Sequence, residues 1–313
     1  MKIKKPKFWD YNKPNIISYI LWPLSLFLQF LSYLKLLIVS KKKFKEIKTI
    51  CVGNIYVGGT GKTSLSLMIY DILLKNKIKT CFIKKYYSDQ KDEQKILENK
   101  GKLFNFSKRE LSLEKAIKEN YEVAIFDDGL QDKSIEYDLS FVCFNNLNFI
   151  GNGLTMPSGP LRESFKNIKK YKYIFLNGNM ENIKNIREKI LETNSNAKIF
   201  EAKYIPMNIK EFDLNEKYLV FSGIGNHKTF LSMLKNNKMI INKDIEFPDH
   251  YNYSEKDLKN ILKISKNNNL KILTTEKDFF RINLKLNEIK FIKSKLEISN
   301  EKDLINTLSK LYE

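Results

Sequence analysis

The sequence predicts an α/β fold in which a mainly parallel sheet carries helices on both faces. Short apolar runs alternate along the chain with stretches that have the apolar periodicity of amphipathic helices. The first of these runs, Thr49–Val52, leads through a glycine-rich loop into the helix-like stretch Ser64–Lys75, which is the order of a βα unit. With 313 residues and 42% apolar residues, the chain is long enough for a substantial core.

We expect the chain to have three parts. Residues 1–45 are predicted to form a membrane-associating helix segment, residues 46–205 the nucleotide-binding core, and residues 206–313 a second, smaller α/β lobe. The predicted strands and helices of the two lobes are Asp138–Phe144, Tyr173–Asn177, Glu181–Leu191, Lys198–Ala202, Lys217–Phe221, Thr229–Asn236, Ser254–Asn267 and Lys271–Thr274. We expect an active site in a cleft between the lobes.

The N-terminal segment has the composition of a membrane element. Residues 16–34 carry no formal charge, and basic residues flank them on both sides. Their length permits a transmembrane span, but Pro23 and several polar residues interrupt the run. An interfacial helix, with its apolar face in the acyl boundary and lysines at the headgroups, fits these features better than a span or a buried helix. No A-x-A-like cleavage site follows, so a signal peptide is not favoured.

The glycine-rich loop has the pattern of a phosphate-binding loop, which makes the predicted fold one of P-loop NTPase type. Residues 53–63 read GNIYVGGTGKT, between a predicted strand and a predicted helix. Glycines allow the backbone N–H groups to surround the phosphates, and the helix N-terminus adds partial positive charge. Lys62 would reach the β- and γ-phosphates of ATP, and the Thr63 hydroxyl would bind Mg²⁺. The predicted nucleotide-binding residues here are Gly58, Gly59, Thr60, Gly61, Lys62, Thr63 and Ser64. Tyr56 occupies the position of the first glycine of the general pattern.

A second metal-coordinating element follows the apolar run Val123–Phe126, which ends in Asp127, Asp128 and Gly129. A carboxylate at the end of a neighbouring buried strand is the usual partner of a phosphate-binding loop. One of the two acids should bind Mg²⁺ directly or through water, and the sequence leaves open which one. The alternative is that the acids only cap a helix.

The net charge of +19 is compatible with nucleic acid, anionic lipid or a phosphorylated substrate. Almost all of it is lysine scattered among isoleucine and asparagine, which an AT-rich genome would also produce. No RNP-like string, zinc spacing or basic aromatic cluster indicates nucleic-acid binding. The three cysteines are widely spaced, which predicts reduced thiols and no structural zinc.

Several strings together resemble the lipid A 4'-kinase (tetraacyldisaccharide 4'-kinase) family. In chain order they are WPLS at 22–25, GN-x-x-x-GGTGKT at 53–63, DDGLQ at 127–131, GNG at 151–153, P-x-GPLRE at 157–163, GIGN at 223–226, FPDH at 247–250 and TEKD at 275–278.

The resemblance implies transfer of a phosphoryl group from ATP to the 4'-hydroxyl of an acylated glucosamine disaccharide 1-phosphate, which is a lipid A precursor. It also implies a location at the cytoplasmic face of the bacterial inner membrane, either peripheral or N-terminally anchored. A lipid substrate requires an active site at the bilayer surface, which accounts for the N-terminal segment and for a preference for anionic lipid. No nucleic-acid partner is expected, and the oligomeric state stays open.

The resemblance also suggests roles for other residues. Gln131 of the DDGLQ string would contact the nucleotide. Arg162 would stabilise charge on the transferring phosphate, and Glu163 would help to orient metal or ligand; their alternative is an exposed ion pair. Only four arginines occur in the chain, so one inside a motif favours bidentate anion binding.

The catalytic base is the least direct of these predictions. In the family it is the Asp of a GDE string, and the best match here is Asp92, with Lys91 in place of the glycine. His250 of the FPDH string would orient it, so that the pair takes the hydroxyl proton. The alternative is that Asp92 is a solvated helix N-cap.

Two departures from the family pattern lie on the acceptor side. A segment of SRGYG type is here Lys84–Ser88, with a shortened connection to the GDE-like string, and Asp132 replaces the usual histidine. A kinase of another membrane sugar lipid therefore remains an alternative. A membrane-associated regulatory P-loop ATPase is disfavoured, because Val57 stands where its signature lysine would precede the glycines.

Overall fold

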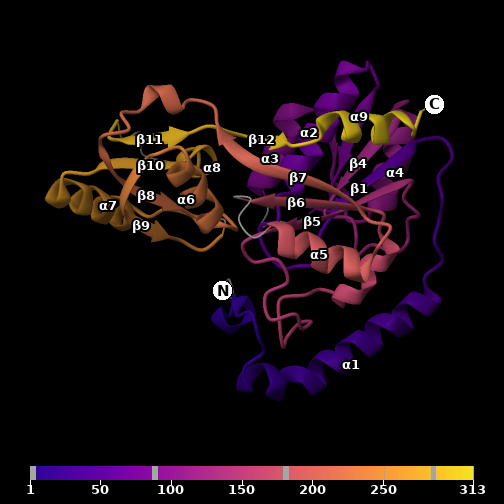
Figure 1. Cartoon of the computed structure of the whole chain (residues 1–313). Helices are drawn as coiled ribbons and strands as arrows, with labels where there is room; N and C mark the ends of the chain where they lie inside the picture. Colours follow the sequence, from indigo (N-terminus) through magenta and orange to yellow (C-terminus); the bar gives the residue numbers. More distant parts are fainter. Residues whose placement is uncertain (1–4, 87–90, 179–182, 250, 283–286, 313) are drawn as a thin grey trace. The chain divides into compact units, whose positions relative to one another are not determined.

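The computed structural model describes residues 5–86, 91–178, 183–249, 251–282 and 287–312, with only the backbone at positions 91 and 92. The chain divides into two compact units. The first comprises residues 1–202 and 298–313, and the second comprises Lys203–Glu297 (Figure 1). The chain thus returns to the first unit at its C-terminus, whereas the sequence predicted a second lobe extending over 206–313.

The first unit is built on an eight-stranded sheet with the strand order β12-β7-β6-β5-β1-β4-β2-β3. Strand β1 lies between β4 and β5 and is parallel to both, and β2 with β3 and β5 with β6 are also parallel pairs. The strands are β1 (Lys48–Gly53), β2 (Thr80–Ile83), β3 (Leu103–Phe104), β4 (Val123–Asp127), β5 (Leu139–Asn145), β6 (Tyr173–Gly178), β7 (Lys198–Pro206) and β12 (Ser294–Ile298). This arrangement confirms the predicted α/β fold with a mainly parallel sheet.

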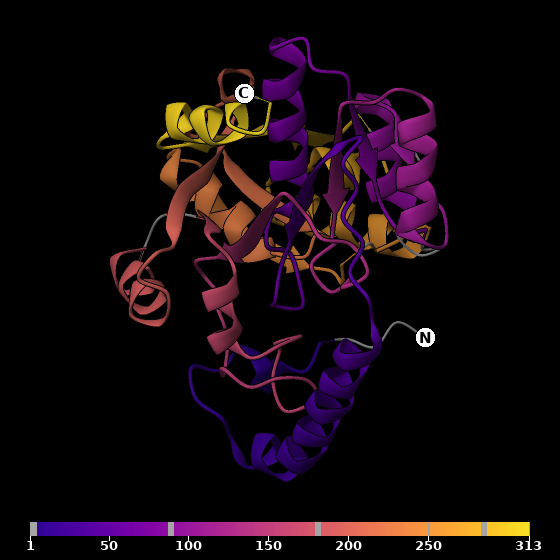
Figure 2. The ribbon, with the colours of Figure 1, turned by 90° about the vertical axis from the view of Figure 1, so that its right-hand side faces the viewer.

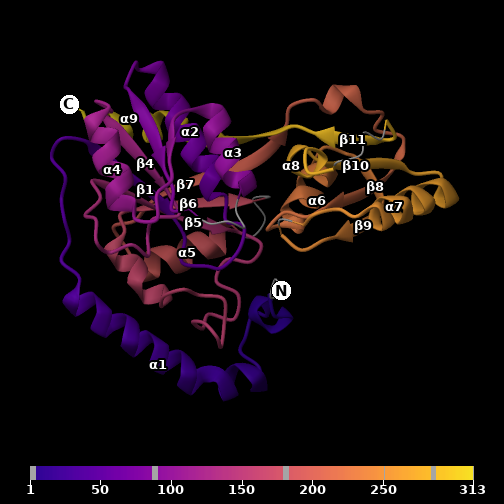
Figure 3. The same cartoon turned by 180° about the vertical axis from the view of Figure 1, so that it is seen from behind.

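Helices cover both faces of this sheet, because most residues of its central strands are buried and apolar, and such strands must be covered on both sides. Helices α2 (Lys62–Lys75), α3 (Lys91–Lys100) and α4 (Arg109–Lys118) lie in front of the sheet in Figure 3. Helices α5 (Ile183–Thr193) and α9 (Glu301–Ser309) lie in front of it in Figure 1. The three cysteines are buried in this unit as free thiols, as predicted.

The second unit has its own parallel sheet with the order β11-β10-β8-β9. Its strands are β8 (Lys217–Ser222), β9 (Ile240–Glu246), β10 (Lys271–Thr275) and β11 (Ile289–Ile292). Its helices are α6 (His227–Asn236), α7 (Glu255–Asn268) and α8 (Glu276–Phe279).

Short 3₁₀ turns occur in both units. The first unit contains η1 (Lys7–Asp10) and η2 (Phe165–Lys170), and the second contains η3 (Ile209–Glu211).

The N-terminal helix α1 (Ile16–Ile38) presents its polar stripe to the protein and its apolar residues outward, the reverse of an ordinary surface helix. Ser18 and Ser25 are its only fully buried residues among those described, whereas Trp22, Phe27 and Leu31 are each more than 40% exposed. By length and apolarity α1 could cross a membrane, as the sequence indicated. Figure 2 shows it beneath the loop that follows β5.

The end of β6 gives a test of the backbone geometry. Gly178 has φ 142°, and a Cβ there would lie 1.5 Å from the Asn146 Oδ1 atom. We expect Gly178→Ala to lower the Tm by about 5–10 °C, because both strain and a clash arise in the sheet. Gly153→Ala is the matched control, since Gly153 has φ 79° but its nearest neighbour is 3.8 Å away. Equal Tm values for the two variants in a thermal melt would contradict this account.

Candidate active site

The loop between β1 and α2 has the backbone geometry of a phosphate-binding loop. Gly61 has φ 81° and is the N-cap of α2, and Gly58 has φ 140°. These are conformations that side chains with a Cβ rarely adopt, so the loop needs glycine at both positions. These glycines are partly exposed and lie directly before the N-terminus of α2, which carries partial positive charge. The loop can therefore bind an anion at this end of the helix.

Buried amides support this loop from beneath. The Asn54 side chain donates to the Thr60 hydroxyl over 2.9 Å and to the Gly58 carbonyl over 3.3 Å. Asn177, at the end of β6, donates its side-chain N–H to the Thr60 carbonyl and accepts from Asn145 at the end of β5 over 3.1 Å. Thr60 thus fixes the loop through two hydrogen bonds, in which its hydroxyl accepts from Asn54 and its carbonyl accepts from Asn177. Sequence reasoning missed Asn145 and Asn177, although polar residues ending two neighbouring apolar strands are a detectable signal.

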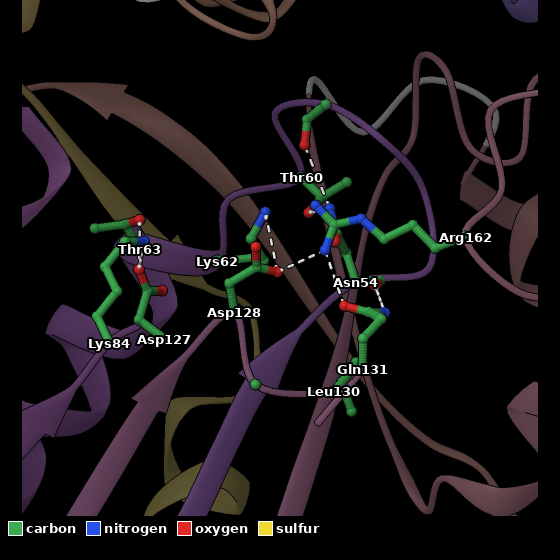
Figure 4. Close-up of polar contacts among 12 residues, drawn as sticks. Asn54, Thr60, Lys62, Thr63, Lys84, Asp127, Asp128, Leu130, Gln131 and Arg162 are labelled. Atoms are coloured by element: carbon green, nitrogen blue, oxygen red, sulfur yellow. Dashed lines mark hydrogen bonds and ion pairs between the residues drawn. The ribbon is translucent and has the colours of Figure 1, made fainter. Parts of the chain in front are cut away.

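Asp127 ends strand β4 beside the start of α2. The register pairs Val52 with Asp127, so the carboxylate lies at the same sheet edge as the glycine loop. It is fully buried and accepts from the Thr63 hydroxyl (3.3 Å), the Ser66 hydroxyl (3.1 Å) and the Lys84 ammonium (2.7 Å). The structure therefore brings two of the three predicted metal-site residues, Thr63 and Asp127, together (Figure 4).

Asp128 lies between two cations. Its Oδ1 atom is 2.9 Å from the Arg162 Nη1 atom and 3.8 Å from the Lys62 Nζ atom (Figure 4). Its backbone has φ 63°, in the left-handed region, and the buried Arg109 donates to its carbonyl over 2.6 Å. Burial alone would raise the pKa of Asp128, but Lys62 and Arg162 hold that pKa well below its usual value. The carboxylate is thus ionised at neutral pH.

Gln131 connects Arg162 to the loop. Its side-chain N–H donates to the Asn54 carbonyl over 2.8 Å, and its side-chain oxygen accepts from Arg162 over 2.8 Å. The backbone N–H of Arg162 also donates to the Ile55 carbonyl over 2.7 Å. Arg162 and Gln131, both predicted site residues, are therefore held within the same group of side chains as Lys62.

Glu163 has different surroundings from its neighbour Arg162. Its carboxylate accepts from the Asn167 side chain over 3.0 Å and from the Tyr171 hydroxyl over 3.1 Å. Burial and the Glu163 charge raise the pKa of Tyr171 well above its usual value, so the phenol keeps its proton and donates it. These contacts hold the loop after Arg162 in place, and Arg162 pairs with Asp128 instead of with Glu163.

The structure describes the predicted catalytic base Asp92 only in part, and it does not describe its predicted partner His250. Asp92 lies in the first turn of α3, and its side chain is outside the described residues. His250 lies outside the described residues altogether.

The N-terminal segment is bonded directly to the glycine loop. The Tyr56 hydroxyl donates to the Asp10 carboxylate over 2.5 Å, and Lys5 donates to the same carboxylate over 2.7 Å. Tyr56 is 2% exposed, so the residue that departs from the general loop pattern serves as an anchor for the N-terminal segment.

Helix α1 is bonded to the loop that leads to Arg162. The Ser25 hydroxyl donates to the Thr155 carbonyl over 3.0 Å, and Gln29 donates to the Thr155 hydroxyl over 2.8 Å. The Asn152 side chain donates to the Ser18 hydroxyl over 3.0 Å. Hydrogen bonds on three turns of the helix therefore fix its polar stripe against residues 152–158.

The site has the donors that ATP and Mg²⁺ require. Glycine N–H groups, a helix N-terminus and Lys62 suit a triphosphate, and Lys62 and Arg162 both contact the Asp128 carboxylate, which shows that the two cations can share one anion. The Thr63 hydroxyl with two carboxylates supplies hard oxygen donors of the kind that Mg²⁺ prefers. The arrangement can thus bind a nucleoside triphosphate and neutralise charge on its terminal phosphate.

Comparisons with known proteins agree with this geometry. The family model described as tetraacyldisaccharide-1-P 4'-kinase matches residues 17–106 and 92–313. A Pelagibacter ubique protein named tetraacyldisaccharide 4'-kinase is 58% identical over 316 residues, which cover 100% of this chain and 99% of the relative. A Rickettsia typhi protein of the same name is 32% identical, with 98% of each chain covered. A crystal structure of LpxK from Aquifex aeolicus in complex with ATP has the same fold, with a TM-score of 0.65, 21% identity, and 95% and 97% of the two chains covered.

Asp128→Asn tests the electrostatic arrangement. The variant leaves Lys62 and Arg162 without an anion, so we expect the Tm at pH 7 to fall by about 5 °C. Because the pKa of Asp128 is depressed on folding, its contribution is complete above the usual Asp pKa and is lost as the pH falls towards the lower folded value. The difference in Tm from the native protein should therefore narrow only below about pH 4.

The matched control is Asp71→Asn, which removes an exposed ion pair with Lys100 and should change the Tm by about 1 °C or less. A difference for Asp128→Asn that did not change with pH down to about pH 2 would contradict the depressed pKa.

Proposed function

The chain belongs to the tetraacyldisaccharide-1-P 4'-kinase family, and we propose that it transfers the γ-phosphate of ATP to the 4'-hydroxyl of a tetraacyldisaccharide 1-phosphate at the site around Lys62. This activity makes it an ATP-dependent kinase of lipid A biosynthesis. The observation that carries the proposal is the convergence of Lys62 and Arg162 on one carboxylate beside the glycine loop.

The first step is to bind the triphosphate. The N–H groups of Gly58 to Thr63 surround the β-phosphate, and the Lys62 ammonium moves from Asp128 to a phosphate oxygen. Arg162 remains anchored by Gln131 and can bind the γ-phosphate without losing its position. A substrate anion would therefore replace the internal anion between the two cations, and little rearrangement of the protein is needed.

Mg²⁺ is part of the proposal, with the Thr63 hydroxyl and the Asp127 and Asp128 carboxylates as its protein partners. When bound with the triphosphate, the ion would neutralise charge that develops on the transferred group. Thr63 is orientated for this role by Asp127, to which it donates.

For the transfer itself we propose Asp92 as the base, with His250 as its orienting partner. The base takes the proton from the 4'-hydroxyl, and the hydroxyl oxygen forms a bond to the γ-phosphorus as the bond to the β-γ bridging oxygen breaks. The products are ADP and the 4'-phosphorylated lipid. Arg162 and Lys62 stabilise the charge on the phosphoryl oxygens during this step.

We further propose that α1 lies in the interface of the inner membrane at its cytoplasmic face, where ATP is available. Its polar stripe is occupied by residues 152–158, so a helix that crossed the bilayer would take this loop with it into the hydrocarbon. Its exposed apolar residues can instead enter the acyl boundary, while the flanking lysines favour anionic headgroups.

Substitutions at three positions test the proposed chemistry. In detergent micelles that contain the disaccharide 1-phosphate lipid, Lys62→Ala should reduce transfer of labelled γ-phosphate by about 10²-fold or more. Asp92→Ala should reduce kcat by about 10²–10⁴-fold, and His250→Ala by less, because it acts through Asp92. Native nucleotide binding without phosphorylation of this lipid would contradict the proposed acceptor and favour another sugar lipid.

A second test concerns the membrane. Phe27→Asp with Leu31→Asp places two charges on the exposed apolar side of α1, so binding to phosphatidylglycerol vesicles should weaken by about tenfold or more. Leu74→Asp is the control, because Leu74 is 54% exposed on another helix of the same unit. Added salt should weaken binding of the native protein. Retention in the membrane fraction after an alkaline carbonate wash would indicate a spanning helix and contradict the interfacial one.

A further inference from the structure

Lys84 is a buried cation next to the phosphate site. It follows strand β2, its side chain is 1% exposed, and its backbone N–H donates to the Phe104 carbonyl over 3.2 Å. Lysine is almost never fully buried unless it is paired. Its ammonium lies 2.7 Å from the Asp127 Oδ2 atom and 2.7 Å from the Glu93 Oε2 atom (Figure 4 shows the contact with Asp127).

The two carboxylates keep this lysine charged. Burial alone would lower the pKa of Lys84, but the charges of Asp127 and Glu93 and their hydrogen bonds raise it above its usual value. Both contacts of the ammonium lie inside the protein, with carboxylates of β4 and α3. Its charge therefore acts on protein groups.

These two carboxylates belong to different elements of the site. Asp127 ends β4 and accepts from Thr63 and Ser66 of α2, so it is fixed to the phosphate-binding helix. Glu93 lies in the first turn of α3, directly after Asp92. Lys84 thus links the phosphate side of the sheet to the turn that carries the proposed base.

We propose that Lys84 is a positioning residue for phosphoryl transfer, whose ammonium, shared by Asp127 and Glu93, holds the first turn of α3 and Asp92 at a fixed distance from the phosphate-binding loop. The inference rests on the proposed function, because it assumes Asp92 as the base. Strand β2 ends at Ile83 and α3 begins at Lys91, so the ion pair joins the residue directly after β2 to the first turn of α3. A base must be held within a fraction of an ångström, so loss of this link should affect the transfer step more than nucleotide binding.

Glu93→Ala is the sharpest test, because it breaks the link on the α3 side and leaves Asp127 paired with Lys84. We expect kcat for phosphate transfer to fall by about tenfold, while the dissociation constant for a fluorescent ATP analogue and the Tm change little. Glu93→Gln should recover part of the kcat, because its amide oxygen still accepts from the ammonium. Lys84→Met should lower both kcat and the Tm, since it also leaves Asp127 buried without its cation.

Lys100→Met is the matched control. Lys100 lies at the other end of α3 and pairs with Asp71 of α2 over 2.7 Å, but this pair is exposed. Its removal should leave kcat and nucleotide affinity at native values. The comparison separates a general loosening of α3 from loss of the contact at its first turn.

The outcomes distinguish this inference from the proposed function. A native kcat in Glu93→Ala, with Asp92→Ala inactive, would overturn the positioning role and leave the base in place. Equal losses of kcat and of nucleotide affinity in Glu93→Ala would also overturn it, because they would indicate a structural role at the phosphate site. Full activity in Asp92→Ala would overturn the proposed base and, with it, this inference.

Discussion

Strands β1 and β4 are paired in a parallel register that sets Val52 opposite Asp127, and the contacts of the phosphate site depend on this pairing. It places the end of β4 beside the glycine loop that ends β1. Asp127 can then accept from Thr63, and Asp128 can lie between Lys62 and Arg162. A shift of the register by one residue would move Asp127 to the other face of the sheet and would separate these groups.

Around these two strands, ion pairs hold the side chains of the site in place. Asp127 ends one buried strand and Asp128 follows it directly, and different cations neutralise the two carboxylates. Lys84 pairs with Asp127 inside the protein, and Lys62 and Arg162 pair with Asp128 at the loop. Lys62 and Arg162 lie beside the partly exposed glycines, and we propose that a triphosphate takes the place of the carboxylate there. The role that we propose for the buried pair of Lys84 and Asp127 is instead to hold the helices around the site.

The sequence predicted the parts of the site that follow from local order. Parallel strands end at the same edge of a sheet, so a glycine loop after one buried strand and acids at the end of another could be expected at that edge, as found for Lys62, Thr63 and Asp127. The surroundings of Glu163 and the roles of Asn177 and Lys84 could not. These features depend on the direction in which a side chain points and on partners that are far away in the sequence. Asn177, for example, donates to the carbonyl of Thr60. The C-terminal return of the chain to the first sheet was missed for the same reason, because the strand pattern of β12 does not specify its partner.

Asp128 lies between Lys62 and Arg162, where we propose that the substrate anion binds. A crystal structure with Mg²⁺ and a non-hydrolysable ATP analogue measures this most directly. We predict that the Lys62 Nζ atom lies within hydrogen-bond distance of a phosphate oxygen and has left Asp128, with Arg162 on the γ-phosphate and still bonded to Gln131. A triphosphate bound elsewhere, or Lys62 still paired with Asp128 alone, would contradict the account.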